Sequence, residues 1–252
     1  MNHSQACRAV GMSRNSKYYK AVMPLKDAPV IKAIETITNG SRKGRMKVIK
    51  MVQRKHPEFG SSRIRRVYEQ QGFSLNRKPK RRVAHNPSNP ISLAFKPNEE
   101  WALDFMSDAL IDGRKIRMLN IVDHCNRMCL GVKVSLSLPT RRVIEFLERA
   151  IEKYGKPLRI RTDNGPEFIS KVFQQWMHDN KIDWCKIPKG RPDQNAIIER
   201  FNRTYREDVL DANLFKTIGQ VQEISDKWII HYNEERPHQS LQYKTPFEYA
   251  AA

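Results

Sequence analysis

Cysteine is scarce in this chain of 252 residues, and no two cysteines form a C-x-x-C pair. The four are Cys7, Cys125, Cys129 and Cys185. Four thiols at irregular spacing do not build a disulfide framework, and no second ligand pair at zinc spacing accompanies His124, Cys125 and Cys129. We therefore expect reduced cysteines and no structural zinc site.

Long apolar runs are also missing. The sequence contains neither a run of 18 apolar residues nor the charged and apolar regions of a signal peptide. A spanning helix and secretion are therefore not expected. We expect a cytoplasmic protein with no membrane partner.

Acidic residues are rare at the start of the chain. Residues 1–98 hold 22 Lys and Arg against 4 Asp and Glu, a net charge of +18, whereas residues 99–252 hold 24 against 23. So basic a segment attracts polyanions, and nucleic acid is the commonest soluble one. An acidic membrane surface is the alternative. The length favours one large domain with a smaller appendage.

Residues 1–82 are predicted to form a small, basic, all-helical region. Its first 25 residues have the outline of a helix-turn-helix whose second helix begins at Ser13. Further helical patterns cover 30–38, 46–55 and 62–71. Residues 83–98, rich in Pro, Asn and Ser, are predicted to be a linker.

Basic side chains gather at the end of this helical region. They are Arg63, Arg65 and Arg66 in the last helix, followed by Arg77, Lys78, Lys80, Arg81 and Arg82. The three helical arginines point away from the apolar stripe and could therefore contact phosphates. A solvated basic face is the alternative. The total charge favours contact with DNA.

From residue 99 onward, strands alternate with helices. The patterns predict strands near 101–106, 116–122, 128–134, 157–162 and 182–186, and helices near 140–154, 166–179 and 192–210. Three strands before the first long helix indicate an antiparallel meander, and the later alternation indicates a mixed α/β sheet. We expect an RNase H-like mixed sheet flanked by helices over residues 99–252.

The end of this domain is predicted to be an amphipathic helix that is halted by Pro237 and packs on the core. Contact of Arg236 and His238 with DNA is the alternative. The four tryptophans are expected to fill the core: Trp101, Trp176, Trp184 and Trp228.

Asp104 interrupts an apolar strand. Strand alternation places Trp101, Leu103 and Phe105 on one face and Asp104 on the other. A carboxylate among apolar neighbours is costly unless a metal ion, an arginine or a hydrogen-bonded turn pairs with it. Asp104 is therefore a candidate metal ligand.

Asp163 follows a strand and precedes the tight turn Asn164-Gly165, after which Pro166 begins a helix. The carboxyl end of a strand in an α/β sheet faces the crevice where ligands bind. A turn aspartate or a helix cap is the alternative. Glu167 competes as a ligand, but the helix dipole alone explains its place in the first turn.

Glu199 lies in the helix predicted over 192–210. The 3.6-residue period gives it a polar face shared with Asn195, Asn202, Arg203 and Arg206. The glutamate could bind a metal while these neighbours hold phosphates, and a surface pair with Arg203 is the alternative.

Basic residues also lie just ahead of this helix. Lys186, Lys189 and Arg191 could line a DNA path or form an exposed basic loop.

The three acids stand in the contexts W-x-x-D, D-N-G-P-E-F and P-x-Q-N-A-x-x-E-R-F-N, with 35 residues between Asp163 and Glu199. This pattern resembles the retroviral-integrase-type transposases of bacterial insertion sequences, of the second-reading-frame (OrfB) type. The resemblance extends from about His56 to the end and includes H-P-E-F-G and Y-N-E-E-R-P-H-Q-S-L. No His/Cys zinc module precedes Asp104, which favours a transposase over an integrase.

The resemblance implies that Asp104, Asp163 and Glu199 form a catalytic D-D-E triad, and that Arg206 lies near transposon-end DNA. It implies two Mg²⁺ or Mn²⁺ ions per site, in keeping with the preference of hard cations for carboxylate oxygens. The implied activity is strand cleavage and strand transfer at insertion-sequence ends.

The implied partners are terminal-repeat and target DNA, further copies of the chain in a synaptic complex, and an upstream-frame (OrfA) protein. The expected place of action is the bacterial nucleoid. Two alternatives stay open: an RNase H-like nuclease that cuts without joining, and a transposase-derived DNA-binding protein that does not use its acids.

Overall fold

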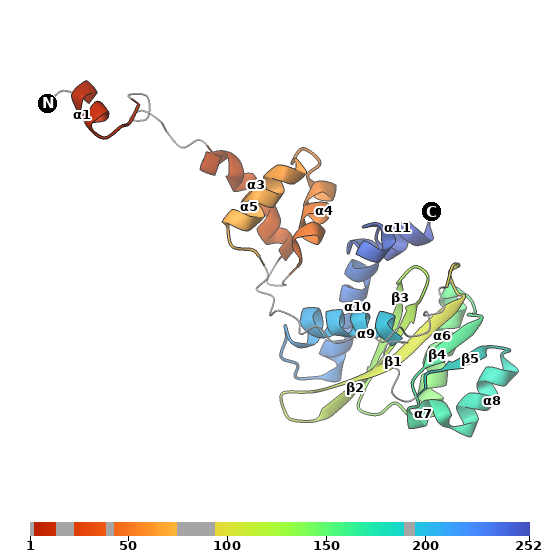
Figure 1. Ribbon diagram of the computed structural model, residues 1–252. Coiled ribbons are helices and arrows are strands. Elements are labelled where there is room, and N and C mark those ends of the chain that lie inside the picture. The colour runs from red at the N-terminus through yellow and green to blue at the C-terminus, as the bar shows by residue number, and fades with distance from the viewer. Residues whose placement is uncertain (1–2, 14–22, 39–42, 75–93, 189–194) are drawn as a thin grey trace. The chain divides into compact units, whose positions relative to one another are not determined.

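The computed structural model describes residues 3–13, 23–38, 43–74, 94–188 and 195–252 (Figure 1). The chain divides into two compact units, residues 1–76 and 77–252. The predicted start of the linker at residue 83 falls outside the described residues.

The described part of the first unit is helical, as its sequence predicts. Its helices are α1 (His3–Ala9), α3 (Met23–Thr38), α4 (Arg45–Lys55) and α5 (Ser61–Gln70). The last three share an apolar core that includes the fully buried Ile34, Val48 and Ile64. α4 and α5 match their predicted ranges within one residue, whereas α3 begins earlier than predicted. The helix expected to begin at Ser13 lies mostly outside the described residues.

Buried Asp27 of α3 binds two arginines of α5. Its carboxylate accepts hydrogen bonds from Arg66 (2.8 and 2.9 Å) and Arg63 (3.2 Å). The hydrogen bonds from Arg66 contribute most to lowering the pKa of Asp27. Arg65 lies 3.4 Å from Glu69, one turn along the same helix. A phosphate would have to compete with Asp27 for Arg63 and Arg66, so contact of these arginines with DNA stays a prediction.

A mixed five-stranded sheet forms the centre of the second unit (Figure 1). Its strands are β1 (Glu100–Ala109), β2 (Lys115–Asp123), β3 (Cys129–Ser135), β4 (Arg159–Thr162) and β5 (Asp183–Lys186). Their order is β3-β2-β1-β4-β5. The first three are antiparallel, and β4 and β5 run parallel to β1. The predicted meander and the α/β class are therefore confirmed.

Helices cover both faces of this sheet. They are α6 (Thr140–Tyr154), α7 (Pro166–Ile169), α8 (Lys171–Asp179), α9 (Ala196–Tyr205), α10 (Ile218–Glu234) and α11 (Pro246–Ala250), with a π-helical turn η2 (Arg206–Leu210) and a 3-10 turn η3 (Gln239–Leu241). The single helix expected over 166–179 is interrupted at Ser170, whose hydroxyl accepts a hydrogen bond from the backbone of Phe173 and caps α8. That prediction is wrong because a local cap starts a second helix.

Alternation along β1 supplies both apolar layers. Ala102 and Met106 pack with residues of α9 and α10, while Trp101 and Leu103 pack with α6 and α8 on the other side. Asp104 belongs to the side of Ala102, as predicted. Trp101 and Trp228 are buried, and Trp176 and Trp184 are only partly buried against the core.

The C-terminal helix α10 ends at Glu234, before Pro237, and packs on β3. Arg236 follows it and is 8% exposed. Its guanidinium lies 2.5 Å from the carboxylate of Asp208, which also accepts a hydrogen bond from Trp228 (3.2 Å). Packing of this segment on the core is therefore confirmed, and Arg236 is committed to an internal ion pair.

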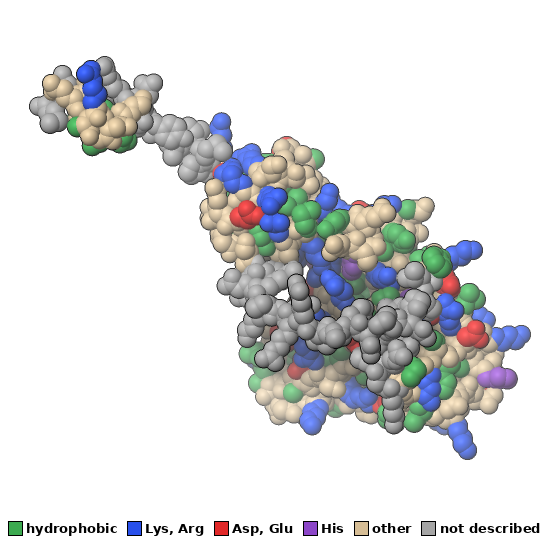
Figure 2. All heavy atoms as spheres, viewed as in Figure 1, with side chains coloured by type: hydrophobic (Ala, Val, Ile, Leu, Met, Phe, Trp, Pro, Cys, Tyr) green, Lys and Arg blue, Asp and Glu red, His purple; other side chains and the backbone are tan. Residues whose placement is uncertain are grey.

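Basic side chains are spread over the visible faces of both units, as Figure 2 shows. Among the residues whose structure is described, no helix is long and apolar enough to cross a membrane.

Candidate active site

Asp104 stands half-buried in the middle of β1, opposite Asn120 of β2. Its Oδ2 accepts a hydrogen bond of 2.6 Å from the Asn202 amide of α9. Its Oδ1 accepts one of 2.9 Å from the backbone N–H of Phe105. The carboxylate therefore has a fixed orientation and does not have an arginine partner among these contacts.

Neighbouring carboxylates raise the pKa of Asp104. Burial is the largest cause, followed by repulsion from Asp163 and, more weakly, from Glu199, and together they bring this pKa to about 6. Asp163 lies beyond the end of β4, and Glu199 lies on α9. Two acids from other parts of the fold thus lie within electrostatic reach of Asp104.

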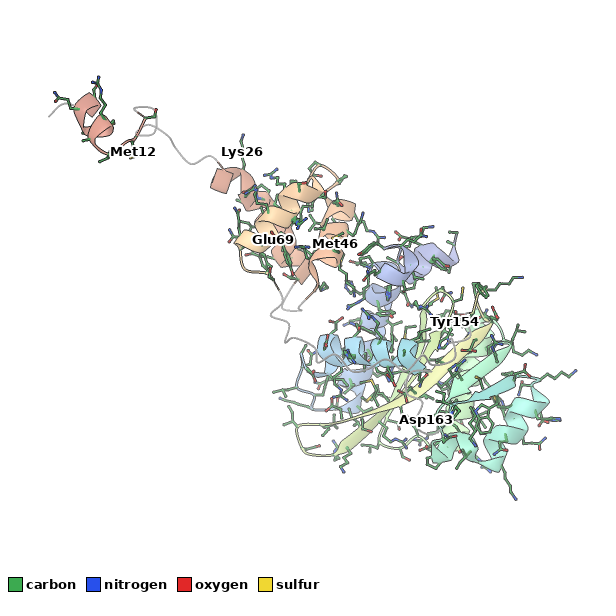
Figure 3. The ribbon with its side chains drawn as sticks, in the orientation of Figure 1. Met12, Lys26, Met46, Glu69, Tyr154 and Asp163 are labelled. Carbon is green, nitrogen blue, oxygen red and sulfur yellow. The ribbon has the colours of Figure 1, made fainter. Side chains whose placement is uncertain are left out.

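Asp163 is exposed and begins the turn that leads into α7. Its Oδ1 accepts a hydrogen bond of 3.0 Å from the backbone N–H of Gly165. A Cβ at residue 165 would lie only 3.1 Å from that oxygen, so glycine permits the tight turn. Figure 3 shows Asp163 near one end of the sheet and Tyr154 near the other. The predicted turn role is confirmed, and it leaves Asp163 exposed at the edge where β4 ends.

Glu167 has a partner that its sequence position did not indicate. It forms an ion pair with Arg117 of β2, whose guanidinium also lies 4.3 Å from the ring centre of Phe105. Its side chain is 12% exposed. Beyond the helix dipole, this ion pair explains Glu167 and ties α7 to the sheet.

The predicted polar face of α9 is only partly exposed. Glu199 and Arg203 are exposed, as expected, but Asn195 and Asn202 are 6% and 9% exposed. The side chains of the predicted polar face therefore differ in exposure, and Asn202 turns inward to Asp104. A burial of this extent makes direct contact of Asn195 with a phosphate harder than the sequence implied.

Arg206 begins the π-helical turn that follows α9. Its guanidinium donates to the backbone oxygen of Ser107 (2.8 Å) and lies 3.5 Å from Asp108. The side chain is 40% exposed. Arg206 is thus tethered to β1 beyond Asp104, with part of its surface free to meet a ligand.

Several predicted DNA contacts lie outside the described residues. They are Lys78, Lys80, Arg81, Arg82, Lys189 and Arg191. Lys186 is described and exposed, and its Nζ lies 5.1 Å from the ring centre of Trp184.

The three acids suit a hard divalent cation by the chemistry of their oxygen atoms. Across the described ranges, no three His, Cys, Asp or Glu side chains are gathered tightly enough to hold a metal ion, and this includes Asp104, Asp163 and Glu199. Yet the repulsion that raises the pKa of Asp104 is what a cation among Asp104, Asp163 and Glu199 would relieve. All three offer oxygen ligands, which Mg²⁺ and Mn²⁺ prefer.

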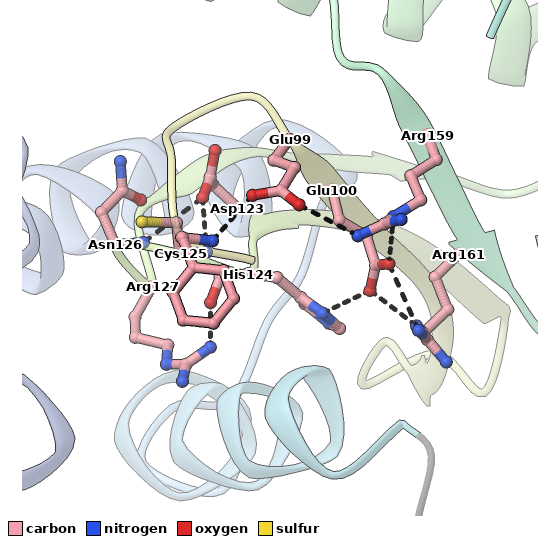
Figure 4. Close-up of polar contacts among 10 residues, drawn as sticks. Glu99, Glu100, Asp123, His124, Cys125, Asn126, Arg127, Arg159 and Arg161 are labelled. Carbon is pink, nitrogen blue, oxygen red and sulfur yellow. Dashed lines mark hydrogen bonds and ion pairs between the residues drawn. The ribbon is translucent and has the colours of Figure 1, made fainter. Parts of the chain in front are cut away.

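A buried ionic network holds the strands that carry two of these acids (Figure 4). Glu100, at the start of β1, is 0% exposed. Its carboxylate accepts hydrogen bonds from Arg161 (2.7 Å) and Arg159 (2.8 Å) of β4 and lies 2.6 Å from Nδ1 of His124. Burial opposes ionisation of Glu100, but the contacts with His124 and Arg161 outweigh it and lower its pKa to about 2. β1 is thus fixed to β4 by charge as well as by the sheet.

Sequence reasoning missed Glu100 and Asn120 as parts of this site, and it named Asn202 without its contact to Asp104. A polar residue inside the apolar strand Met118–Val122 is a signal that could have singled out Asn120. The partners of Asn202 and Glu100 are distant in the sequence and left no local signal.

Two domain families described as Integrase core domain match the chain, one over residues 94–192 and one over 180–246. An uncharacterized 31.7 kDa protein of insertion element IS407 from Burkholderia multivorans is 34% identical over 253 residues, covering 100% of this chain and 91% of the relative. An uncharacterized 39.2 kDa protein of IS476 from Xanthomonas euvesicatoria is 30% identical, with 100% and 73% covered. The transposase of IS904 from Lactococcus lactis is 27% identical, with 72% and 70% covered.

A solved structure shares the fold. A chain in the structure of the simian T-cell lymphotropic virus intasome in complex with PP2A regulatory subunit B56 gamma superimposes with a TM-score of 0.55. It is 17% identical, and the match covers 87% of this chain and 74% of that one. The predicted RNase H-like architecture, a mixed sheet flanked by helices, is confirmed.

Replacing Glu100 with Gln tests the ionic network. Because the folded pKa of about 2 lies below the ordinary 4.5, the stabilisation is complete above pH 4.5 and is lost as pH falls from 4.5 toward 2. The shift corresponds to about 3 kcal/mol of unfolding free energy. In urea titrations, wild type should therefore lose stability more steeply than Glu100→Gln across that window.

At pH 7 the same variant should be the less stable protein, since Arg161 keeps its charge and loses its buried partner. If the unfolding free energies of wild type and Glu100→Gln changed with pH in parallel, the ionic network around Glu100 would not be the source of this stabilisation.

Proposed function

Since the chain belongs to the bacterial insertion-sequence transposases with an integrase core, and so acts in DNA transposition, we propose that it cuts and joins strands through a D-D-E triad. The triad consists of Asp104, Asp163 and Glu199. The observation that carries this proposal is that Asp163 and Glu199 both lie near enough to repel the carboxylate of Asp104, which adds to the effect of burial and brings the pKa of Asp104 to about 6. Acids gathered at a cost in repulsion are typical of cation-binding catalytic sites.

In this proposal the three acids hold two Mg²⁺ or Mn²⁺ ions. Bound there, the ions supply Lewis acidity to the attacking water or 3′-hydroxyl and to the departing oxygen. Asp104 presents its carboxylate in the orientation that Asn202 and the Phe105 backbone set. Asp163 stands exposed at the end of β4, where a DNA strand can approach it.

Exposed basic groups beside the acids are proposed to hold the DNA backbone. Arg203 lies one helical turn beyond Glu199 and is exposed. Arg206 is proposed to contact element-end DNA with its free surface. Lys189 and Arg191, which lie a few residues before α9, are proposed to line the same path.

We further propose that several copies of the chain bring two DNA ends together, with an upstream-frame protein as a possible partner. A multimer supplies the two active sites that paired ends require. The structurally similar viral chain comes from an assembly named an intasome, which is in keeping with this proposal. A nuclease of the same fold that only cuts is the competing function, and it would never form joined products.

Substitutions in the triad test the catalytic proposal. Asp163→Asn and Glu199→Gln should each lower the rate of Mg²⁺-dependent nicking and joining by a factor on the order of 10³ or more, because the cation loses a charged ligand. The measurement uses labelled duplexes carrying the element ends. Glu207→Gln, which changes an exposed acid of the adjoining π-helical turn, should leave the rate unchanged.

Equal nicking and joining activity of wild type and Asp163→Asn would contradict the proposal that the triad is catalytic. Nicking that depends on the triad but never yields joined strands would establish the competing nuclease.

The basic region is tested by salt. Replacing Lys78, Lys80, Arg81 and Arg82 with Ala should flatten the plot of log binding constant against log salt concentration, by about 0.9 for each DNA phosphate that the variant no longer neutralises. Filter binding of the element-end duplex between low and physiological salt measures the slope. An unchanged slope would show that this basic run does not meet the DNA backbone.

A further inference from the structure

A chain of side-chain hydrogen bonds leads from a buried strand residue to Asp104. Asn120 Nδ2 donates to Asn202 Oδ1 at 2.7 Å, and Asn202 Nδ2 donates to Asp104 Oδ2 at 2.6 Å. Asn120 is 0% exposed and Asn202 is 9% exposed. Three residues from β2, α9 and β1 are thus joined away from solvent.

The donor at one end fixes the direction of the whole chain. An amide presents a donor on one side and an acceptor on the other. Because Asn120 offers its N–H group to Asn202 Oδ1, the Nδ2 group of Asn202 is turned toward Asp104. A carboxylate accepts such a donor in its ionised form, which is also the form that binds a cation.

Stability alone does not account for these asparagines. Asn120 Oδ1 is buried and has no hydrogen-bond partner among the described residues. An unsatisfied buried acceptor costs free energy of folding, and an apolar side chain would avoid that cost. A buried polar group kept at such a cost is more often explained by function.

The place of this series of hydrogen bonds in the fold indicates what its function is. Asn120 is the register partner of Asp104 in the β1–β2 pair. Asn202 lies on α9 one helical turn after Glu199, so its hydrogen bond to Asp104 joins the two elements that carry these acids. A hydrogen bond there opposes the repulsion between their carboxylates.

We propose that Asn120 and Asn202 are positioning residues, which hold the carboxylate of Asp104 in the orientation in which it can share a divalent cation with Glu199. Asn202 acts on Asp104 directly, and Asn120 acts only by fixing the amide of Asn202. This inference rests on the proposed role of Asp104 as a metal ligand.

A structural role for Asn202 can be separated from this one with a matched control. Asn233 of α10 is also 9% exposed, and its amide bonds both backbone groups of Cys129 on β3 at 2.9 Å. It therefore anchors a helix to the same sheet without touching Asp104. Asn233→Leu should cost stability and leave cation binding alone.

The experiment measures the dissociation constant of Mn²⁺ by electron paramagnetic resonance of the free ion, together with the thermal midpoint of each metal-free protein. The variants are Asn202→Leu, Asn120→Leu, the double variant and Asn233→Leu. Asn202→Leu should weaken Mn²⁺ binding about 10-fold or more, the range for groups that orient metal ligands. Asn120→Leu should also weaken Mn²⁺ binding.

The double variant tests the relay. If Asn120 acts only through Asn202, then adding Asn120→Leu to Asn202→Leu should change the Mn²⁺ dissociation constant by less than about 2-fold. Fully additive losses would overturn the relay. Asn202→Ala, which removes the amide without adding bulk, should reproduce the loss of Mn²⁺ affinity. If both Asn202 variants bound Mn²⁺ as tightly as wild type does, the proposal would be overturned.

Asp104→Asn distinguishes failure of this inference from failure of the proposed function. If Asp104→Asn weakens Mn²⁺ binding but the Asn202 variants do not, the positioning role is wrong and the metal-ligand role stands. If Asp104→Asn binds Mn²⁺ as wild type does, the metal-ligand role fails and the positioning role fails with it.

Discussion

Repulsion of a half-buried carboxylate, Asp104, by two neighbouring carboxylates is the constraint that the second unit has to meet. Asp104 is half-buried, and Asp163 and Glu199 lie near enough to raise its pKa. Burying the carboxylate of Asp104 and placing it near two other carboxylates both cost folding free energy in a protein without a bound cation. Rigid elements bear most of this cost: Asp104 lies on β1, Glu199 lies on α9, and Asp163 lies in the turn directly after β4.

The sheet and two polar networks supply that rigidity. β1 and β4 are neighbours in the sheet, and the buried Glu100 network binds them together at the start of β1. Asn202 binds α9 to β1 at Asp104 itself. In the proposed mechanism the same acids meet a scissile phosphate in every cycle, and fixed strands and helices position ligands more accurately than loops do.

Much of the fold is readable because it is encoded locally. The 3.6-residue period predicts α6 with the bounds it has, and strand alternation predicts which side of β1 carries Asp104. Asn202 was grouped with Glu199 on one polar face, and its contact with Asp104 was not predicted because the two residues lie 98 positions apart and no local pattern reports such a contact. The pairing of Asp27 with Arg66 was hidden in the same way. The acids themselves were singled out by their resemblance to a family, since each alone has an ordinary structural explanation.

The account depends most directly on the proximity of the acids, and the titration of Asp104 measures it. Carboxyl ¹³C NMR of the metal-free protein should give a pKa of about 6 for Asp104. In Asp163→Asn this pKa should fall toward the ordinary 3.8, because a neighbouring negative charge is removed, while burial keeps it above that value. An Asp104 pKa that is the same in both proteins would contradict the convergence of these acids.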